Sequence, residues 1–381
     1  MLNWLPGRPK PDIHTQIAAL SRFQDRLPGR SDIRVKLAGL YLHLGEFGKA
    51  ESVLGQKVCL DSPDALLCHA RLARHRGRAS IAEGHFYAAQ ALGSKVALAE
   101  LGRLLVEQER YEEAVPLCRE ALATDPGDFV AAMALCRSLI ALNQIDELGQ
   151  WGGACLALGQ WNALAPTALA HANQTELLEG IVSPKSSITS MTNIVDADTP
   201  GQLFEQLTEH TSRSKLPASN AGKGGGWRIS HLLELGIPSV ETLFERIKQG
   251  IRERALGFDA PTDWHPLHCV PENVGLETWA NIFAGDGYED WHCHPAGWLS
   301  GVFYVDVPVS EEGSSPDGQI EFGPLPISGQ NDLEAWPKQL IMPQKGALLL
   351  FPSYFGHRTY PSQSSRPRIS IAFDVVPKTG H

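Results

Sequence analysis

The stretch DWHCHPAGWLSGVFYV, residues 290–305, decides the fold of the C-terminal part of the chain. It opens with two histidines separated by one residue and continues into an apolar, aromatic run that is typical of a buried β-strand. Two later stretches have the same character, LLLFPSYFGHRTYP at 348–361 and RPRISIAFDVV at 366–376. These and other short runs are separated by Gly, Pro and Asp turns, and together they predict a small antiparallel barrel or sandwich.

The polar residues at the start of this stretch indicate a metal site. Asp290, His292 and His294 lie two residues apart, so on a strand their side chains share one face. Three polar groups between two tryptophans are costly to bury without partners, and a metal ion would satisfy them. A lone His-x-His pair is more often a polar edge that faces solvent. His357, which ends the second apolar run, shifts the interpretation toward a metal.

The third stretch adds a candidate anion site. Arg366, Arg368 and Ser370 are evenly spaced and share one face of the predicted strand, while apolar residues occupy the other face. An arginine inside a barrel needs a carboxylate or phosphate partner, and we find no acidic residue at a matching position in this strand. A small dicarboxylate ligand is therefore expected beside Arg368. Arg366 precedes a proline, and we expect it in solvent where the strand begins.

Together, the three stretches resemble the 2-oxoglutarate- and iron(II)-dependent oxygenases, in particular a bacterial branch that often carries tetratricopeptide repeats. The resemblance covers roughly residues 275–377 and implies a double-stranded β-helix, a jelly-roll or cupin-like barrel. It also implies Fe(II), 2-oxoglutarate as co-substrate, and O2. Carried over by position, His292, His294 and His357 would be the catalytic metal ligands. Arg368 would hold the far carboxylate of the co-substrate and Ser370 would hydrogen-bond to it.

The sequence departs from the family pattern at one ligand. His294 occupies the position where the family usually has a carboxylate. Either His292, His294 and His357 all bind the metal, or Asp290 supplies the carboxylate and one histidine lies behind it. A third interpretation is a metal-free, inactive barrel.

Two further residues are candidates for the co-substrate pocket. Tyr304 lies on the strand that follows the histidine pair, and Asn281 lies on the strand before it. A buried asparagine needs hydrogen-bond partners, which the co-substrate or a ligand histidine would supply. Alternatively, Asn281 ties two strands together.

Residues 31 to about 160 read as helical hairpins. The clearest unit spans residues 98–126, where Gly102 and Ala114 let two helices approach and Tyr111 fills the space between them. It resembles a tetratricopeptide repeat. We therefore predict an α + β chain of two domains, with a helical-repeat solenoid at 1–180, a linker at 181–226 and the oxygenase barrel at 227–381. The repeats either orient the barrel or hold a peptide or protein partner on their concave face.

The amino-acid composition argues against some classes of protein. The net charge of −10 argues against nucleic acid as the main partner, because phosphate binding needs a basic patch. No apolar run approaches the roughly 18 residues of a membrane helix, so no membrane association is expected. The seven cysteines are scattered without CxxC spacing, which favours a reducing, cytoplasmic compartment.

These observations predict an Fe(II)- and 2-oxoglutarate-dependent dioxygenase, an oxidoreductase that hydroxylates a peptide or protein side chain or a small metabolite and releases succinate and CO2. Two alternatives are a non-catalytic interaction protein with a structural or metal-sensing barrel, and a three-histidine iron dioxygenase that does not use 2-oxoglutarate. The sequence does not identify the substrate, the position oxidised, the oligomeric state or what the repeats bind.

Overall fold

The structure is a computed structural model that describes residues 2–5, 13–55, 62–157, 161–179, 181–182, 187–211, 214–216, 222–256, 270–308, 317–329 and 331–378. The chain forms two compact units. The repeat unit is Lys10–Leu164, and the barrel unit is Met1–Pro9 together with Ala165–His381. The units thus divide after residue 164, whereas the repeats were expected to end at residue 180. None of the helices in the described residues is long and apolar enough to cross a membrane.

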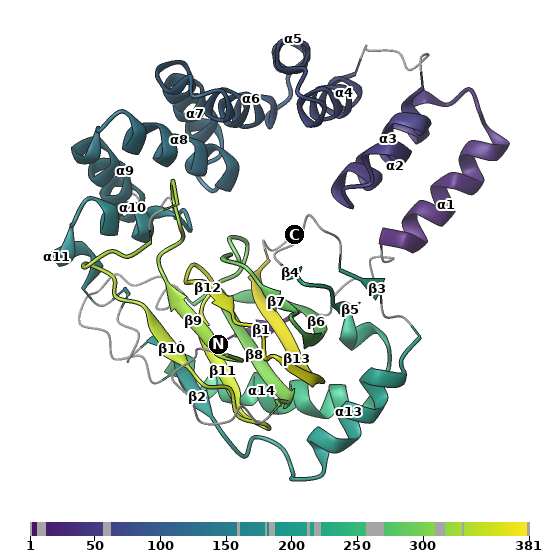
Figure 1. Ribbon diagram of the computed structural model, residues 1–381, viewed down its shortest axis with the longest axis vertical. Coiled ribbons are helices and arrows are strands. Elements are labelled where there is room, and N and C mark those ends of the chain that lie inside the picture. The colour runs from purple at the N-terminus through teal and green to yellow at the C-terminus, as the bar shows by residue number, and fades with distance from the viewer. Residues whose placement is uncertain are drawn as a thin grey trace. The chain divides into compact units, whose positions relative to one another are not determined.

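The repeat unit consists of consecutive helices that pack in pairs (Figure 1). They are α1 (Ile13–Arg26), α2 (Ser31–His43), α3 (Phe47–Leu54), α4 (Pro63–His75), α5 (Ala79–Ala91), α6 (Ala97–Glu107), α7 (Tyr111–Thr124), α8 (Phe129–Ala141) and α9 (Ile145–Ala157). Helices α6 and α7 form the unit predicted at 98–126. A Cβ atom at Gly102 would lie 2.5 Å from the Cys118 sulfur, so a larger residue would force the Cys118 side chain or the helices to shift.

The barrel unit is built on one large sheet with the strand order β2-β11-β8-β13-β6-β5-β3, in which β1 also pairs with β6. These strands are β1 (Asn3–Trp4), β2 (Thr189–Met191), β3 (Ser214–Lys215), β5 (Trp227–Ser230), β6 (Asn273–Gly285), β8 (Leu299–Asp306), β11 (Leu348–Pro352) and β13 (Ser364–Pro377). The central pairs β11–β8, β8–β13 and β13–β6 are all antiparallel. The predicted antiparallel sheet domain is therefore confirmed.

A smaller sheet has the order β10-β9-β12, formed by β9 (Ile320–Gly323), β10 (Gln339–Ile341) and β12 (Gly356–Thr359). Phe322 of β9 contacts Phe351 of β11 with ring centroids 4.9 Å apart, which shows that the two sheets face each other. Strands β4 (Gly222–Lys223) and β7 (Tyr288–Glu289) form a separate pair. Two facing sheets of short antiparallel strands are the architecture of the double-stranded β-helix expected from the sequence.

Helix α14 (Pro238–Leu256) packs against the large sheet on the side away from the small one. Its side chains at Val240, Leu243, Phe244, Ile247 and Ile251 are fully buried, as the helical periodicity predicts. Phe244 contacts Phe373 of β13 edge-on, with ring centroids 5.6 Å apart. This contact fixes the strand that carries Arg368 and Ser370.

The segment at 181–226, predicted to be a linker, contains regular structure that belongs to the barrel unit. Strand β2 lies in this segment and pairs with β11 of the large sheet. Helix α13 (Thr199–Glu209) buries Leu203 and Leu207 completely in the same core as α14. The serine- and glycine-rich composition hides these elements, because a few buried leucines are enough to order a short helix against a sheet. The described residues also form α10 (Ala165–His171), α11 (Thr175–Leu178) and the 3-10 turn Leu232–Glu234.

Candidate metal and co-substrate site

The three predicted ligand histidines come from two segments that the backbone ties together. His292 and His294 lie in the loop between β7 and β8, and His357 lies in β12. The amide of His292 donates to the His357 carbonyl at 3.0 Å, and the reverse bond is 2.9 Å. The His294 amide donates to the Ser353 carbonyl at 2.9 Å. The histidine pair thus stands on a loop clamped at two points, not on the continuous strand that its spacing suggests.

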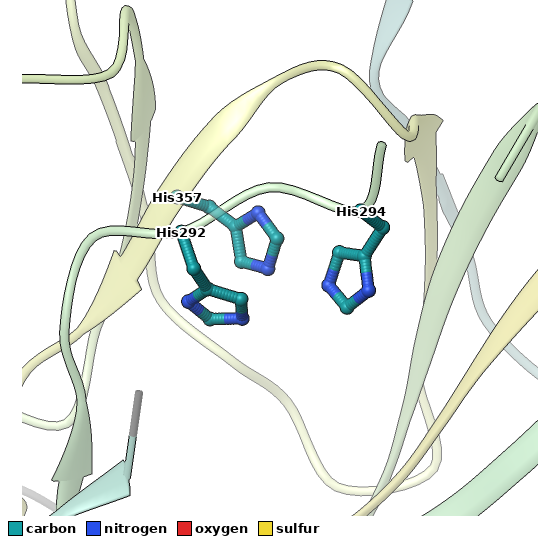
Figure 2. A group of neighbouring side chains, drawn as sticks. All are labelled: His292, His294 and His357. Atoms are coloured by element: carbon teal, nitrogen blue, oxygen red, sulfur yellow. The ribbon is translucent and has the colours of Figure 1, made fainter. Parts of the chain in front are cut away.

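The three imidazoles converge. One ring nitrogen from each of His292, His294 and His357 lies within 4.8 Å of the other two, and Figure 2 shows the rings turned toward a shared space. Their ring centroids are 4.3–5.2 Å apart. Asp290 is not part of this group: it is exposed, and its carboxylate accepts the amide of Trp291 at 2.8 Å.

Each imidazole has an oxygen partner on Nδ1. His292 Nδ1 contacts the Asp290 carbonyl at 2.7 Å, and His357 Nδ1 contacts the Phe355 carbonyl at 3.0 Å. His294 Nδ1 contacts a carboxylate oxygen of Asp374 at 2.9 Å. Carbonyls and carboxylates only accept hydrogen bonds, so each Nδ1 must carry the proton and each Nε2 is left with a lone pair. This tautomer is the one in which all three Nε2 atoms can bind a metal.

Burial keeps two of these rings neutral. It lowers the pKa of His357 well below the ordinary value, and the neighbouring rings of His292 and His294 lower it further. Burial also lowers the pKa of His292, against the opposing effect of Glu289. Neutral imidazole is the form that binds a metal, so these two rings can bind a cation without first losing a proton.

The same cavity contains a buried cation. Arg368 of β13 lines the cavity with the three histidines and is 4% exposed. Its guanidinium donates to Thr359 Oγ1 at 2.8 Å and to the carbonyls of Tyr360 and Gly318 at 3.3 and 3.4 Å. Within the described residues, no carboxylate lies at ion-pair distance from Arg368. Burial lowers its pKa, which expresses the cost of holding this charge away from water.

Tyr304 and Ser370, the two further residues expected near the co-substrate, also line this cavity. The hydroxyl of Tyr304 is buried and has no hydrogen-bond partner in the described part of the chain, and burial raises its pKa. A buried hydroxyl without a partner is uncommon in a folded protein. Tyr304 and Arg368 therefore both face a space that a polar, anionic ligand would satisfy.

The structure separates Arg366 from this site. Arg366 forms two hydrogen bonds with Asp306 of β8, at 2.6 and 2.8 Å. Its side chain is 57% exposed, in line with the expected position, but the Asp306 partner is 1% exposed. Sequence reasoning missed this pair because Asp306 is 60 residues away and becomes a neighbour only through strand pairing.

Asn281 does not reach the cavity surface. It is 1% exposed on β6, its amide donates to Glu289 at 3.1 Å, and its carbonyl accepts from Arg228 at 3.1 Å. Glu289 does line the cavity, and so does Trp279, whose ring stacks on His294 at 5.6 Å. Asn281 thus holds Glu289, a residue of the cavity wall, in place. Glu289 itself was not predicted.

Asp374 was overlooked as well. It stands on the same face of β13 as Arg368, six residues later, in the otherwise apolar run IAFDVV. The sequence signal that could have identified Asp374 is the presence of an acidic residue inside such a run. Its carboxylate contacts His294 and Ser300, not Arg368.

Comparisons with known proteins show which families match parts of this chain. Residues 277–374 match the family described as "Putative 2OG-Fe(II) oxygenase", and residues 105–147 match a tetratricopeptide repeat. The comparison with curated proteins finds no match. The chain is similar to the solved structure of a Pseudomonas putida prolyl-4-hydroxylase, with 14% identity and a TM-score of 0.32 over 51% of this chain and 94% of that one.

Two further solved structures are similar to parts of the chain. One is a prolyl hydroxylase from Trichoplax adhaerens in complex with a hypoxia inducible factor peptide fragment, at 15% identity and a TM-score of 0.37, covering 54% of this chain and 90% of that one. The other is YrrB, a TPR protein with an unusual peptide-binding site, at 16% identity and a TM-score of 0.34, covering 42% and 86%. The two family matches cover separate parts of the chain: residues 105–147 match a tetratricopeptide repeat and residues 277–374 match the 2OG-Fe(II) oxygenase family.

Proposed function

We propose that this protein is an Fe(II)- and 2-oxoglutarate-dependent dioxygenase that hydroxylates a C–H bond. One observation carries the proposal: three imidazoles with free Nε2 atoms share a cavity with a buried guanidinium that has no carboxylate at ion-pair distance in the described residues. A metal cation satisfies the first group and a carboxylate satisfies the second. A ligand that binds the metal at one end and Arg368 at the other meets both needs.

His292, His294 and His357 would hold the iron through Nε2. Three protein ligands leave further positions for the co-substrate and O2. Bound Fe(II) would supply the oxygen chemistry, in which 2-oxoglutarate, O2 and a substrate C–H group become succinate, CO2 and an alcohol. The protein's own contribution is the fixed tautomer of each histidine and the apolar wall that limits access of water.

Arg368 would bind the far carboxylate of 2-oxoglutarate, with its planar guanidinium donating two hydrogen bonds. The hydroxyls of Tyr304 and Ser370 would donate to the same carboxylate or to its neighbour. Thr359 already orients the guanidinium through its Oγ1 atom. Because the guanidinium is buried, this contact discriminates strongly against ligands that lack the second carboxylate.

For the substrate we propose a peptide or protein side chain or a small metabolite. A tetratricopeptide repeat supports the peptide, because stacked helical hairpins present an extended surface to a partner chain. We also propose a reducing, cytoplasmic location, which is supported by the free thiols of Cys68, Cys118, Cys136, Cys155 and Cys293.

Anaerobic titration tests the proposal directly. Adding Fe(II) and then 2-oxoglutarate to the purified full chain should give a weak visible metal-to-ligand charge-transfer band, and 2-oxoglutarate should raise the melting temperature only when metal is present. Exposure to O2 should then produce succinate. If iron binds but 2-oxoglutarate neither shifts the melting temperature nor gives the band, the co-substrate assignment is wrong and a three-histidine iron site of another kind remains.

A further inference from the structure

Asp374 occupies an unusual place beside the three-histidine group. It is 8% exposed on β13, one carboxylate oxygen lies 2.9 Å from His294 Nδ1, and the other accepts the Ser300 hydroxyl at 2.6 Å. Among the described residues, no lysine or arginine lies within ion-pair distance of this carboxylate. Among the three imidazoles, the buried carboxylate of Asp374 contacts that of His294.

The other two rings have different partners. His292 and His357 donate to backbone carbonyls, which are neutral. Only His294 donates to a side-chain carboxylate. Since the Nδ1 partner of a ligand histidine raises the basicity of the ring, the three imidazoles are not equivalent as metal ligands.

Charge explains why one ring should differ. Three neutral imidazoles bring no negative charge to a divalent cation in a buried cavity, and an uncompensated buried charge is costly. Glu289 also lines the cavity, but it accepts a hydrogen bond from Asn281 and lies 3.6 Å from the Arg228 guanidinium. Arg228 lies close enough to interact electrostatically with both carboxylates, but of the two it is Asp374 that hydrogen-bonds to a ligand ring.

The surroundings hold Asp374 in this orientation. Ser300 donates its single hydroxyl proton to Asp374, so the Ser353 hydroxyl must donate to Ser300, at 2.8 Å. The Ser353 carbonyl also accepts the His294 amide. Ser353 therefore connects to both partners of the Asp374–His294 contact. Ser300 and Ser353 are each 1% exposed, so the chain of hydrogen bonds is protected from water.

We propose that Asp374 is a positioning residue that supplies, through His294 Nδ1–H, the negative charge that no ligand of the three-histidine site carries. The inference rests on the proposed metal site. It assigns to Asp374 two effects: it fixes His294 with Nε2 toward the metal, and it strengthens that nitrogen as a donor.

Asp374→Asn isolates the charge. The amide oxygen can still accept from His294 Nδ1, and the Ser300 hydroxyl can accept from the amide nitrogen, so shape and hydrogen bonding are kept. We expect Fe(II) and Co(II) affinity, measured anaerobically by chelator competition without 2-oxoglutarate, to fall by about 10- to 100-fold. The visible spectrum of the Co(II) form should shift, and the Fe(III)/Fe(II) midpoint potential should rise, because a weaker donor stabilises Fe(III) less.

Asp306→Asn is the matched control. Asp306 is also a buried carboxylate, at 1% exposure, on the strand next to β13, but its partners are Arg366 and Lys345. Losing it should lower the melting temperature and leave metal affinity within about twofold of the unmodified chain, because its contacts lie outside the ligand set. A purely structural role for Asp374 would give the same pattern as this control.

Ser300→Ala covers the case in which Asp374→Asn does not fold. It removes one hydrogen bond to Asp374 and keeps the charge, so a smaller loss of affinity and a Co(II) spectral shift in the same direction are expected. Unchanged Co(II) affinity and spectrum in a folded Asp374→Asn protein, or in Ser300→Ala where that protein does not fold, would overturn the inference. Failure of the unmodified chain to bind Fe(II) or Co(II) would instead refute the proposed function.

Discussion

Replacing Arg368 with methionine tests the co-substrate site most directly. Methionine matches the aliphatic stem of arginine and has no charge, so the apolar part of the side chain is kept while the guanidinium is lost. Arg368 is a 4% exposed cation with no carboxylate at ion-pair distance in the described residues. Removing such a charge relieves its desolvation but leaves Thr359 and two carbonyls without their donor. We expect these effects to cancel to within about 1.5 kcal/mol in the free energy of unfolding.

The loss in co-substrate binding should be much larger. A hydrogen bond to a charged group is worth about 1.5–3 kcal/mol, and a guanidinium can make two with one carboxylate. The expected loss is therefore about 3–5 kcal/mol, or roughly 150- to 5,000-fold in the Kd of 2-oxoglutarate. Anaerobic calorimetry with the metal-loaded protein measures this Kd, and the metal affinity, measured separately, should change little because Arg368 contacts no ligand histidine.

Arg366→Met is the control on the same strand. It breaks the two bonds to buried Asp306 and leaves that carboxylate with Lys345 alone, 3.3 Å away. Unfolding should become easier by about 1.5–3 kcal/mol while 2-oxoglutarate affinity stays the same. If Arg368→Met folds and binds 2-oxoglutarate within about threefold of the unmodified chain, the assignment of Arg368 is refuted.

The remaining predictions concern other parts of the molecule. Asp290→Ala should keep its metal and His294→Ala should bind it more weakly; measured iron stoichiometry that shows the reverse would make Asp290 the ligand. Burial lowers the pKa of His171 below 6.5 in the folded chain. As pH drops through about 6.5, the unfolded chain therefore binds more protons than the folded chain, and the free energy of unfolding falls. His171→Gln should reduce the slope of this free energy against pH by up to about 1.4 kcal/mol per pH unit, measured in urea melts. Gly102→Leu should destabilise the repeats by at least about 1–3 kcal/mol, because its Cβ would meet Cys118, whereas Gly39→Leu, with open space, should not.

Residues whose role follows from local pattern could be predicted from the sequence. The period of 3.6 in α14 identifies its buried face, because a helix that covers a sheet must present one apolar stripe. The even spacing of Arg368 and Ser370 identifies the strand face that lines the cavity. Gly102 marks the close approach of two helices, because a side chain there would meet the Cys118 sulfur.

Partners that meet only through the fold could not be predicted. Asp374 and His294 are 80 residues apart, and Arg366 and Asp306 are 60 apart. Each pair depends on which strands become neighbours and in which register, and the sequence of one strand does not contain that information. The loop that carries His292 shows the same limit, since its shape is set by hydrogen bonds to distant residues, not by its own alternation.

The face of β13 joins the two halves of the proposed site. Arg368 and Asp374 are six residues apart on one face, a span of about 20 Å along an extended strand, with Ser370 between them. Arg368 brings a positive charge to one end and Asp374 a negative charge to the other, through His294. A dianionic co-substrate beside Arg368 and a divalent metal beside His294 would then give charges that alternate in sign along the strand. Each buried charge would have an opposite neighbour, which is the condition for holding so many of them out of water. A carboxylate directly on the metal is not required for this balance, because Asp374 supplies its charge from behind the imidazole.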